Sequence, residues 1–439
     1  MLLEAIVKAT PSCCPSYLVR LYAHPWTQIL LISLVCFCLP GVIDPTVAAN
    51  AAVALHATTP ATALFIVGPI FSWVGPRICF LIGGWTYALY TGSLLHFNHH
   101  ANGAFVIASG AILGIGASFL WIVQGATMTT YVGESQKGRA IAIFWIIFNL
   151  GGGIGSLASF GLNYNSKSGT VTDSTYIAFL VIMAFGYFLG LLICSPSRIR
   201  LAQLHNAVET EKRSIKGTVI IAIKTMKKWR VACMIPLFYS ANIFYSYQQN
   251  EVNGRTFNIR TRSLNGALYW IAQMLGGLII GLILDMPWFS RSMRARIGWT
   301  VLIITGMVIW GGGYAFQLWE NKPGPIFLYI FYGGYDAFWQ GFAYWLIGTE
   351  SNSSARAAIL VGAYKTFQAT GAAMAWRINA LHMSALTQLG MNWGLCIGSL
   401  VVALPMVWTV SDHTAVETEA GYEGEKQRPA LKTTDSVDV

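Results

Sequence analysis

The sequence predicts an all-α polytopic membrane protein whose twelve transmembrane helices form two pseudo-symmetric bundles of six. Apolar residues make up 55% of the 439 positions and charged residues only 10%, whereas a soluble domain carries about 25% charged residues. The pattern Gln-Gly, eight residues, Glu-Ser also occurs twice, at 124–135 and at 340–351. The copies lie 216 positions apart, about half of the chain, and such repeats are typical of membrane proteins with two related bundles.

Twelve segments are long and apolar enough to span a bilayer, which takes about 20 residues. The expected spans are 27–43, 57–74, 78–95, 103–128, 139–161, 175–194, 231–250, 264–284, 299–316, 325–346, 356–376 and 391–410. The chain therefore divides into an N-terminal segment (1–26), a first bundle (27–194), a basic linker (195–230), a second bundle (231–410) and a disordered tail (411–439).

The distribution of Lys and Arg predicts the orientation of the spans. With both termini inside, the internal segments carry 21 of these residues and the external loops 6. Because cytoplasmic loops are enriched in positive charge, we expect cytoplasmic termini and a cytoplasmic linker in a multi-pass integral membrane protein. The net charge of +10 then reflects topology and indicates no nucleic-acid partner. The segment 215–230 is either an amphipathic helix on the inner leaflet or a plain basic linker.

Catalytic motifs are missing from the sequence. It contains no zinc-ligand spacing, no phosphate-binding loop and no Ser/His/Asp pattern with local support. The cluster of His96, His99 and His100 is interpreted as a solvated turn rather than a metal site. We therefore expect a protein that is not an enzyme and has no cofactor and no metal.

Polar side chains inside the spans are the candidates for contact with a substrate or coupling ion, because ionised groups in hydrocarbon are costly and usually face the bundle interior. Asp336 lies near the middle of the tenth span and Lys365 near the middle of the eleventh. They are expected to pair or to share a polar cavity; a purely structural ion pair is an equal alternative. Gln124 and Asn149 are the candidates of the first half, and Gln340 is added from the second copy of the repeat.

Charged residues at the cytoplasmic ends of spans are candidates for capping or gating. Glu134 and Glu350 each precede a span by a few residues, and capping of that following helix is preferred over proton coupling. Asp285 ends the eighth span and is followed by Arg291 and Arg294, a combination that can join neighbouring helix ends.

Six plus six spans around a basic linker, with a Gly-x-x-x-Asp…Arg loop after the eighth span, resemble the major facilitator superfamily. This resemblance implies that the loop acts as a conformational latch. The corresponding loop of the first half is only Gly75-Pro76-Arg77, without an acid. Arg77 therefore remains a gating candidate, although the missing acid argues against a latch in that half.

Several stretches are similar to the fungal form of the UNC-93-like branch of that superfamily. They are Pro25-Trp26-Thr27-Gln28, Asp44-Pro45-Thr46, Gly75-Pro76-Arg77, Leu120-Trp121 with Gln124-Gly125, Glu134-Ser135-Gln136-Lys137-Gly138, Phe144-Trp145 and Phe148-Asn149. One departure is that Pro40-Gly41 runs directly into Asp44 without the usual Gly-rich insert, which shortens the first span.

The resemblance implies one of two functions. The first is secondary transport of a small solute by rocking of the two halves in the lipid bilayer. The alternative is a non-transporting regulatory or trafficking subunit of another membrane protein, such as an ion channel. Asp336 and Lys365 favour transport, and the missing acid of the first half favours the regulator.

Overall fold

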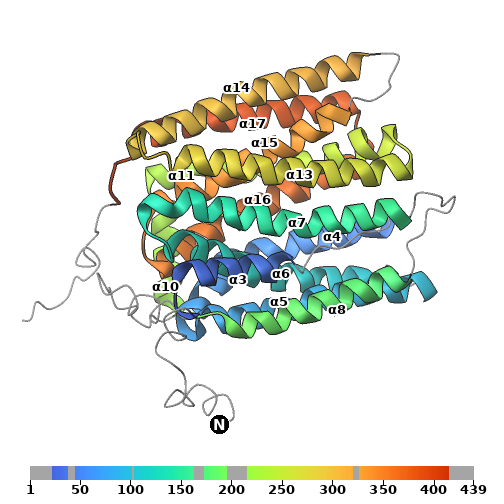
Figure 1. Ribbon diagram of the computed structural model, residues 1–439, viewed down its shortest axis with the longest axis horizontal. Coiled ribbons are helices and arrows are strands. Elements are labelled where there is room, and N and C mark those ends of the chain that lie inside the picture. Colours follow the sequence, from blue (N-terminus) through green and yellow to red (C-terminus); the bar gives the residue numbers. More distant parts are fainter. Residues whose placement is uncertain are drawn as a thin grey trace, which may run out of the picture.

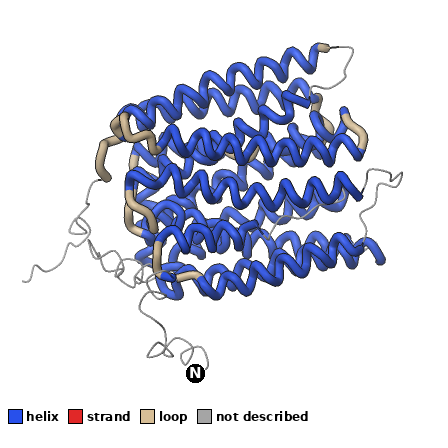
Figure 2. Tube along the Cα trace, viewed as in Figure 1, coloured by secondary structure: helices blue, strands red, loops and turns tan. Residues whose placement is uncertain are grey.

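The computed structural model describes residues 22–37, 45–100, 103–162, 173–194, 215–319 and 326–414. Throughout these ranges the regular secondary structure is helical (Figure 2). The helices run side by side along one direction, with the N-terminal half next to the C-terminal half (Figure 1). The predicted all-α fold of two helical bundles is confirmed.

The first half contains the helices that begin the chain. They are α3 (Pro25–Phe37), α4 (Pro45–Ala61), the π-helix η1 (Thr62–Val67), α5 (Gly68–His100), α6 (Gly103–Thr130), η2 (Glu134–Gln136), α7 (Lys137–Leu162), α8 (Asp173–Leu189) and η3 (Gly190–Leu192). The chain is continuous from α4 to the end of α5 but breaks direction at Gly75, whose φ of 76° suits glycine. The second and third spans meet at this kink.

The start of the second span differs from the expected 57–74, because the helix already begins at Pro45. Residues 45–56 are rich in alanine and therefore only weakly apolar. The small side chain of Ala51 lets α4 approach α6 closely, and a Cβ on Gly110 would lie 2.8 Å from the carbonyl oxygen of Ala51. Such close packing of small residues is common between membrane helices. The expected first span is helical over Pro25–Phe37, and its remainder lies outside the described residues.

The second half begins after a helix of the linker, α10 (Ile215–Met226). Its elements are α11 (Trp229–Ser240), α12 (Phe244–Ser246), the π-helix η4 (Tyr247–Gly254), α13 (Ile259–Leu284), α14 (Arg291–Leu318), α15 (Ile326–Glu350), α16 (Ser354–Ala380) and α17 (Ala385–Trp408). The seventh span is thus interrupted, because α11, α12 and η4 follow one another along it. The α10 helix exposes Ile220 and Ile223 as well as Lys224, so part of the linker is helical and has apolar side chains on its surface.

Taken over the described residues, six helices are individually long and apolar enough to cross a membrane. One of these, Asn50–His100, holds two spans on either side of Gly75. The α3 and α8 helices are apolar but shorter, and α15 and α16 are long but carry buried polar residues. Together with the interrupted seventh span they make the twelve helices of the fold.

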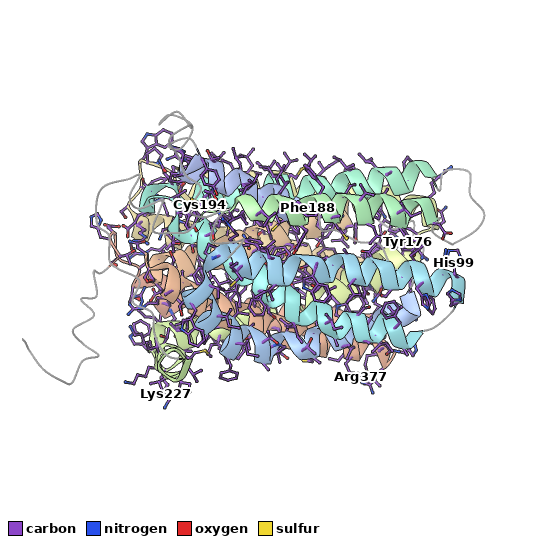
Figure 3. All side chains as sticks on the ribbon, turned by 90° about the horizontal axis from the view of Figure 1, so that it is seen from below. His99, Tyr176, Phe188, Cys194, Lys227 and Arg377 are labelled. Carbon is purple, nitrogen blue, oxygen red and sulfur yellow. The ribbon has the colours of Figure 1, made fainter. Side chains whose placement is uncertain are left out.

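The halves meet mainly where α7 packs on α13 and where α16 packs on α4 and α6. Glycine makes the first of these contacts close: a Cβ on Gly281 would lie 2.6 Å from the carbonyl oxygen of Gly138. The bundle has two ends, which Figure 3 marks by Cys194 and Lys227 on one side and by His99 and Arg377 on the other. The end at which α7 begins and α13 finishes is called the latch end below.

Candidate functional site

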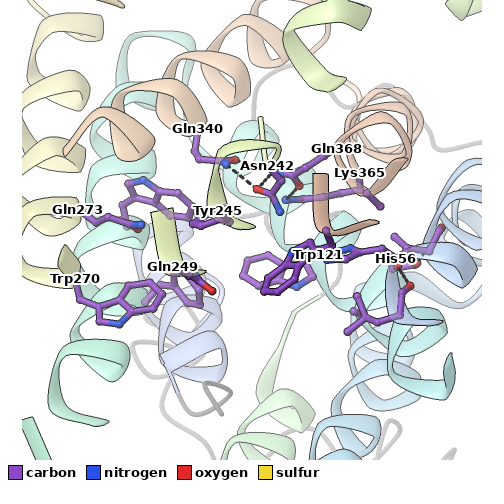
Figure 4. A pocket seen from close by; sticks show the side chains of 18 residues that line it. His56, Trp121, Asn242, Tyr245, Gln249, Trp270, Gln273, Gln340, Lys365 and Gln368 are labelled. Carbon is purple, nitrogen blue, oxygen red and sulfur yellow. Dashed lines mark hydrogen bonds between the residues drawn. The ribbon is translucent and has the colours of Figure 1, made fainter. Parts of the chain in front are cut away.

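A cavity of about 360 Å³ lies between the two halves. The first half contributes an aromatic wall, with Trp121 from α6 and with Trp145 and Phe148 from α7. The second half contributes an amide-rich wall, and Figure 4 shows these side chains converging from several helices. They are Asn242, Tyr245, Gln249, Gln273, Gln340, Lys365 and Gln368. The cavity therefore combines aromatic surface from the first half with amide and ammonium groups from the second.

The spacing of residues on α6 and α7 positions the aromatic wall. Trp145 and Phe148 are three residues apart and so share one face of α7, where their rings stack at a centroid distance of 5.6 Å. Trp121 meets Phe148 edge to face at 5.3 Å, and Trp270 of α13 continues the row at 6.5 Å from Phe148. A flat or ring-shaped molecule can stack against such a surface.

Asp336 lies directly behind the polar wall. Its side chain is 0% exposed, and its carboxylate accepts hydrogen bonds from the Tyr245 hydroxyl, from Gln273 Nε2 at 2.5 Å and from Gln340 Nε2 at 3.2 Å. These three donors line the cavity, whereas Asp336 itself does not. The buried carboxylate thus orients three side chains of the wall.

Lys365 lines the cavity, and its ammonium group lies over three aromatic rings. Its Nζ is 4.8 Å from the ring centroid of Tyr364, 5.1 Å from that of Trp121 and 5.3 Å from that of Tyr344. These distances lie within the range of cation–π attraction. The hydrogen-bond acceptor of Nζ is Gln368 Oε1, at 2.7 Å.

Asp336 and Lys365 share one polar network without forming a direct ion pair. Gln368 accepts from Lys365 and donates to Gln340 Oε1 at 3.1 Å, and Gln340 donates to Asp336. The two amides therefore link the ammonium to the carboxylate. The expected direct pair is therefore not formed, and Lys365 lines the cavity while Asp336 lies behind it.

The other two substrate candidates lie away from the cavity. Gln124 Oε1 accepts from the Tyr344 hydroxyl at 3.1 Å, which joins α6 to α15 across the halves. Asn149 donates to the carbonyl of Trp145 at 2.7 Å, while its Oδ1 is buried without a partner. Both residues are 0% exposed, and neither lines the cavity.

Several residues of the cavity were not predicted from the sequence. Gln368 is one turn from Lys365 on α16, a spacing that would have indicated it. Asn242 and Tyr245 precede an unusually polar run within a span, 247–250. His56 of α4 also lines the cavity, and its Nδ1 is buried without a partner.

At the latch end, Asp285 of the second half caps α7 of the first half. Its two carboxylate oxygens accept the backbone N–H groups of Gly138, at 2.8 Å, and of Arg139, at 2.7 Å. The guanidinium of Arg139 lies 3.5 Å from the same carboxylate. Burial raises the pKa of Asp285 above its usual value, and the two N–H donors oppose that rise.

Lys137, at the start of α7, adds a second link between the halves. It is 1% exposed and donates from Nζ to the Gly348 carbonyl at 2.5 Å and to Asn352 Oδ1 at 2.7 Å. Asn352 in turn donates to Glu134 Oε1 at 2.5 Å, and Glu134 Oε2 lies 3.5 Å from the guanidinium of Arg291. The sequence identifies Lys137 only as a cytoplasmic positive charge and as part of a family-like stretch, because it does not show that the side chain is buried.

The preferred interpretation of Glu134 and Glu350 as caps of the following helices is wrong. Glu134 bonds to Asn352 and to the backbone N–H of Thr414, while Glu350 pairs with Arg230 at 2.8 Å. The start of α7 is capped by Asp285, and Ser353, at the N-cap of α16, makes no side-chain capping bond. At α7, Asp285 from the other half takes the place expected for Glu134. Glu350 pairs with Arg230 instead of capping α16.

The two remaining gating candidates bond within their own halves. Arg294 donates to the carbonyl of Leu284 at 3.1 Å. Arg77 donates to the carbonyl of Ile193 at 2.9 Å and to the Tyr22 hydroxyl at 3.1 Å. The loop of Arg77 thus has no counterpart of the Asp285 contact among the described residues.

The fold and the sequence together define the class of this protein. Residues 27–375 match the family model of the Major Facilitator Superfamily. Two solved members have the same fold: FucP, in the outward conformation, at a TM-score of 0.60 and 9% identity, and the proton:xylose symporter XylE, at 0.63 and 13%. The alignments cover 89% and 92% of this chain and 99% of each solved chain.

Relatives with higher sequence identity show which family of the superfamily the chain belongs to. An UNC93-like protein of Schizosaccharomyces pombe is 39% identical over 88% of this chain and 83% of its own length. UNC93-like protein 1 of Arabidopsis thaliana is 38% identical over 89% of this chain and 92% of its own length. The chain belongs to the UNC93-like family of the Major Facilitator Superfamily, as the resemblance predicted.

Proposed function

We propose that the protein is a secondary transporter that moves a small solute by alternating access, and that the solute binds in the cavity between the halves. The cavity is the observation that carries this proposal, because side chains from both halves line it. Transporters built from structural repeats bind their solutes near the bilayer midplane, at the interface of the repeats. We further propose cytoplasmic termini, following the Lys and Arg distribution, and therefore a cytoplasmic latch end.

Asp336 is the proposed coupling residue. Two similar solved proteins are described as proton symporters, for xylose and for fucose. A proton on Asp336 would weaken its charge-assisted bonds to Tyr245, Gln273 and Gln340, all of which line the cavity. Protonation would thereby change the wall that faces the solute.

A solute screen with the purified full-length protein tests this proposal. Sugars, amino acids, carboxylates and nucleosides are added singly, and the midpoint of thermal unfolding is recorded, because a molecule that binds the folded state raises stability. Each stabilising solute is then offered to proteoliposomes as a radiolabelled compound. Uptake that stops with Asp336→Asn in a correctly folded protein supports the proposal, whereas full transport by that variant rules out an essential coupling role.

The alternative function is a regulatory subunit that binds another membrane protein. The observation that favours it is the asymmetry of the halves, since Asp285 caps the opposite half whereas Arg77 bonds within its own. The exposed Ile220 and Ile223 of α10 offer an apolar surface for a partner. Two results together would favour this function over transport. No solute in the screen stabilises the protein, and a membrane protein co-purifies with wild type but not with Ile220→Ser/Ile223→Ser.

A further inference from the structure

We infer that the cavity takes a small monocarboxylate with a flat or ring-shaped apolar body, and that Lys365 is its counter-charge. This inference rests on the proposed function, in which the cavity is the solute site. It adds the chemical class of the solute, which the fold and the family do not define.

The charge inside the cavity is positive and not directly paired. Lys365 is the only Lys, Arg, Asp or Glu among the described residues that line it. An ammonium has three N–H donors, and one of them is used by Gln368. The rings of Trp121, Tyr344 and Tyr364 stabilise the charge but accept no strong hydrogen bond. Donors thus remain for an anion in the cavity.

Asp336 does not take the place of that anion. It lies beyond the 4.0 Å ion-pair distance from Lys365, is fully buried and is already occupied by the donors Tyr245, Gln273 and Gln340. A buried charge such as the Lys365 ammonium is unfavourable in a medium of low polarity when no opposite charge contacts it directly. A solute carboxylate that approaches from the cavity would supply that contact by a charge-assisted hydrogen bond.

Asn242 supplies a second donor beside Lys365. Its Oδ1 accepts from Gln368 Nε2 at 3.0 Å and from Gln340 Nε2 at 3.3 Å, so the orientation of its amide is fixed (Figure 4). The Nδ2 group donates no hydrogen bond within the described part of the chain and belongs to a residue that lines the cavity. An ammonium and an amide N–H together match the two oxygens of one carboxylate.

The opposite wall fits the rest of such a solute. Trp121 touches the ammonium with its ring face and meets Phe148 edge to face, so a molecule held at Lys365 lies against aromatic surface. A volume of about 360 Å³ is at the lower end of ligand pockets, which measure about 300–1,000 Å³. The cavity therefore suits a molecule of one ring or a short chain, and its single positive charge selects one negative charge.

Matched pairs of carboxylates and amides test the inference. Benzoate, phenylacetate, cyclohexanecarboxylate and nicotinate, each with its neutral amide, are titrated into the full-length protein by calorimetry and by quenching of tryptophan fluorescence. We expect at least one carboxylate to bind about tenfold or more tightly than its amide, which corresponds to about 1.4 kcal/mol. That preference should disappear in Lys365→Met and persist in Lys365→Arg.

Arg377→Gln is the matched control, because it removes an exposed positive charge from the same helix outside the cavity. It should leave the carboxylate preference unchanged. The inference is overturned if no carboxylate binds more tightly than its amide, or if folded Lys365→Met keeps the preference. If only neutral solutes bind and are taken up, transport stands and the anion class fails. If carboxylates bind through Lys365 but are never taken up, the binding site stands and transport fails.

Discussion

The carboxylate of Asp285, at the end of α13, accepts the backbone N–H of Gly138, at the start of α7, at 2.8 Å. These residues belong to different halves of the molecule, 147 positions apart in the chain. The first N–H groups of a helix have no partner within the helix and favour a negative charge. The bond therefore stabilises α7 and holds the halves together at the latch end.

Replacement of Asp285 by alanine should destabilise this arrangement. Asp285→Ala leaves the N–H groups of Gly138 and Arg139 without their acceptor, at a cost of about 1–3 kcal/mol. Asp285→Asn keeps one acceptor and should lose less. Thermal unfolding in detergent, followed by tryptophan fluorescence, gives the order wild type, Asn, Ala from most to least stable.

The exposed Asp173, which pairs with His99, provides the control: Asp173→Ala should change stability by no more than about 1 kcal/mol. An equal loss in both alanine variants would contradict the role of the cap.

In alternating access, the latch end should be closed in one part of the transport cycle and open in the other. The hydroxyls of Thr130 on α6 and Ser354 on α16 are 3.1 Å apart across the halves, which is close enough for a disulfide between cysteines at these positions. We expect oxidised Thr130→Cys/Ser354→Cys to lose uptake of a solute found in the screen, and to regain it on reduction. Each single cysteine variant should transport under both conditions. Normal uptake by the cross-linked protein would show that the halves do not separate at this end.

The buried carboxylate of Asp336 should matter for folding as well as for transport. Asp336→Leu removes the acceptor of Tyr245 and Gln273, and each buried donor without a partner costs about 1–3 kcal/mol. Gln340 Nε2 keeps its bond to the Ala241 carbonyl. Asp336→Asn keeps a carbonyl oxygen of similar shape and should remain nearly as stable as wild type while losing coupled transport. Detergent-solubilised yield and unfolding temperature report on the first effect, and uptake driven by a proton gradient reports on the second. A stable Asp336→Leu protein would contradict the network described here.

The charge of Asp336 and Lys365 was visible in the sequence because each interrupts an apolar run. The partners of Asp336, Tyr245 and Gln273, were not visible, since neutral polar residues are common in spans and their convergence depends on where α12 and α13 lie relative to α15. The repeat predicted equivalent helix ends, but only packing shows that Asp285, and not the nearby Glu134, caps α7. Local sequence thus predicts the helices and their order, whereas contacts between the halves depend on positions far apart in the chain.

Glycine packing along α7 and α13 gives a further prediction, because it determines how closely the halves approach. A Cβ on Gly281 would lie 2.5 Å from the Cβ of Ala142 and 2.6 Å from the Gly138 carbonyl oxygen, distances at which the backbones must move apart. Overpacking of this kind typically costs about 1–3 kcal/mol, so Gly281→Ala should lower the unfolding temperature.

Gly390 of α17 is the matched control, since a Cβ there would meet nothing within 4 Å. Gly390→Ala should leave stability unchanged or raise it by up to about 1 kcal/mol, because alanine favours the helix over glycine.

Gly281→Ala should also loosen the Asp285 cap, whose acceptors lie beside the same contact. Its effect should therefore be smaller in an Asp285→Ala background than in wild type, since interacting neighbours are not additive. Full additivity of the two changes would show that the helix contact and the cap act independently.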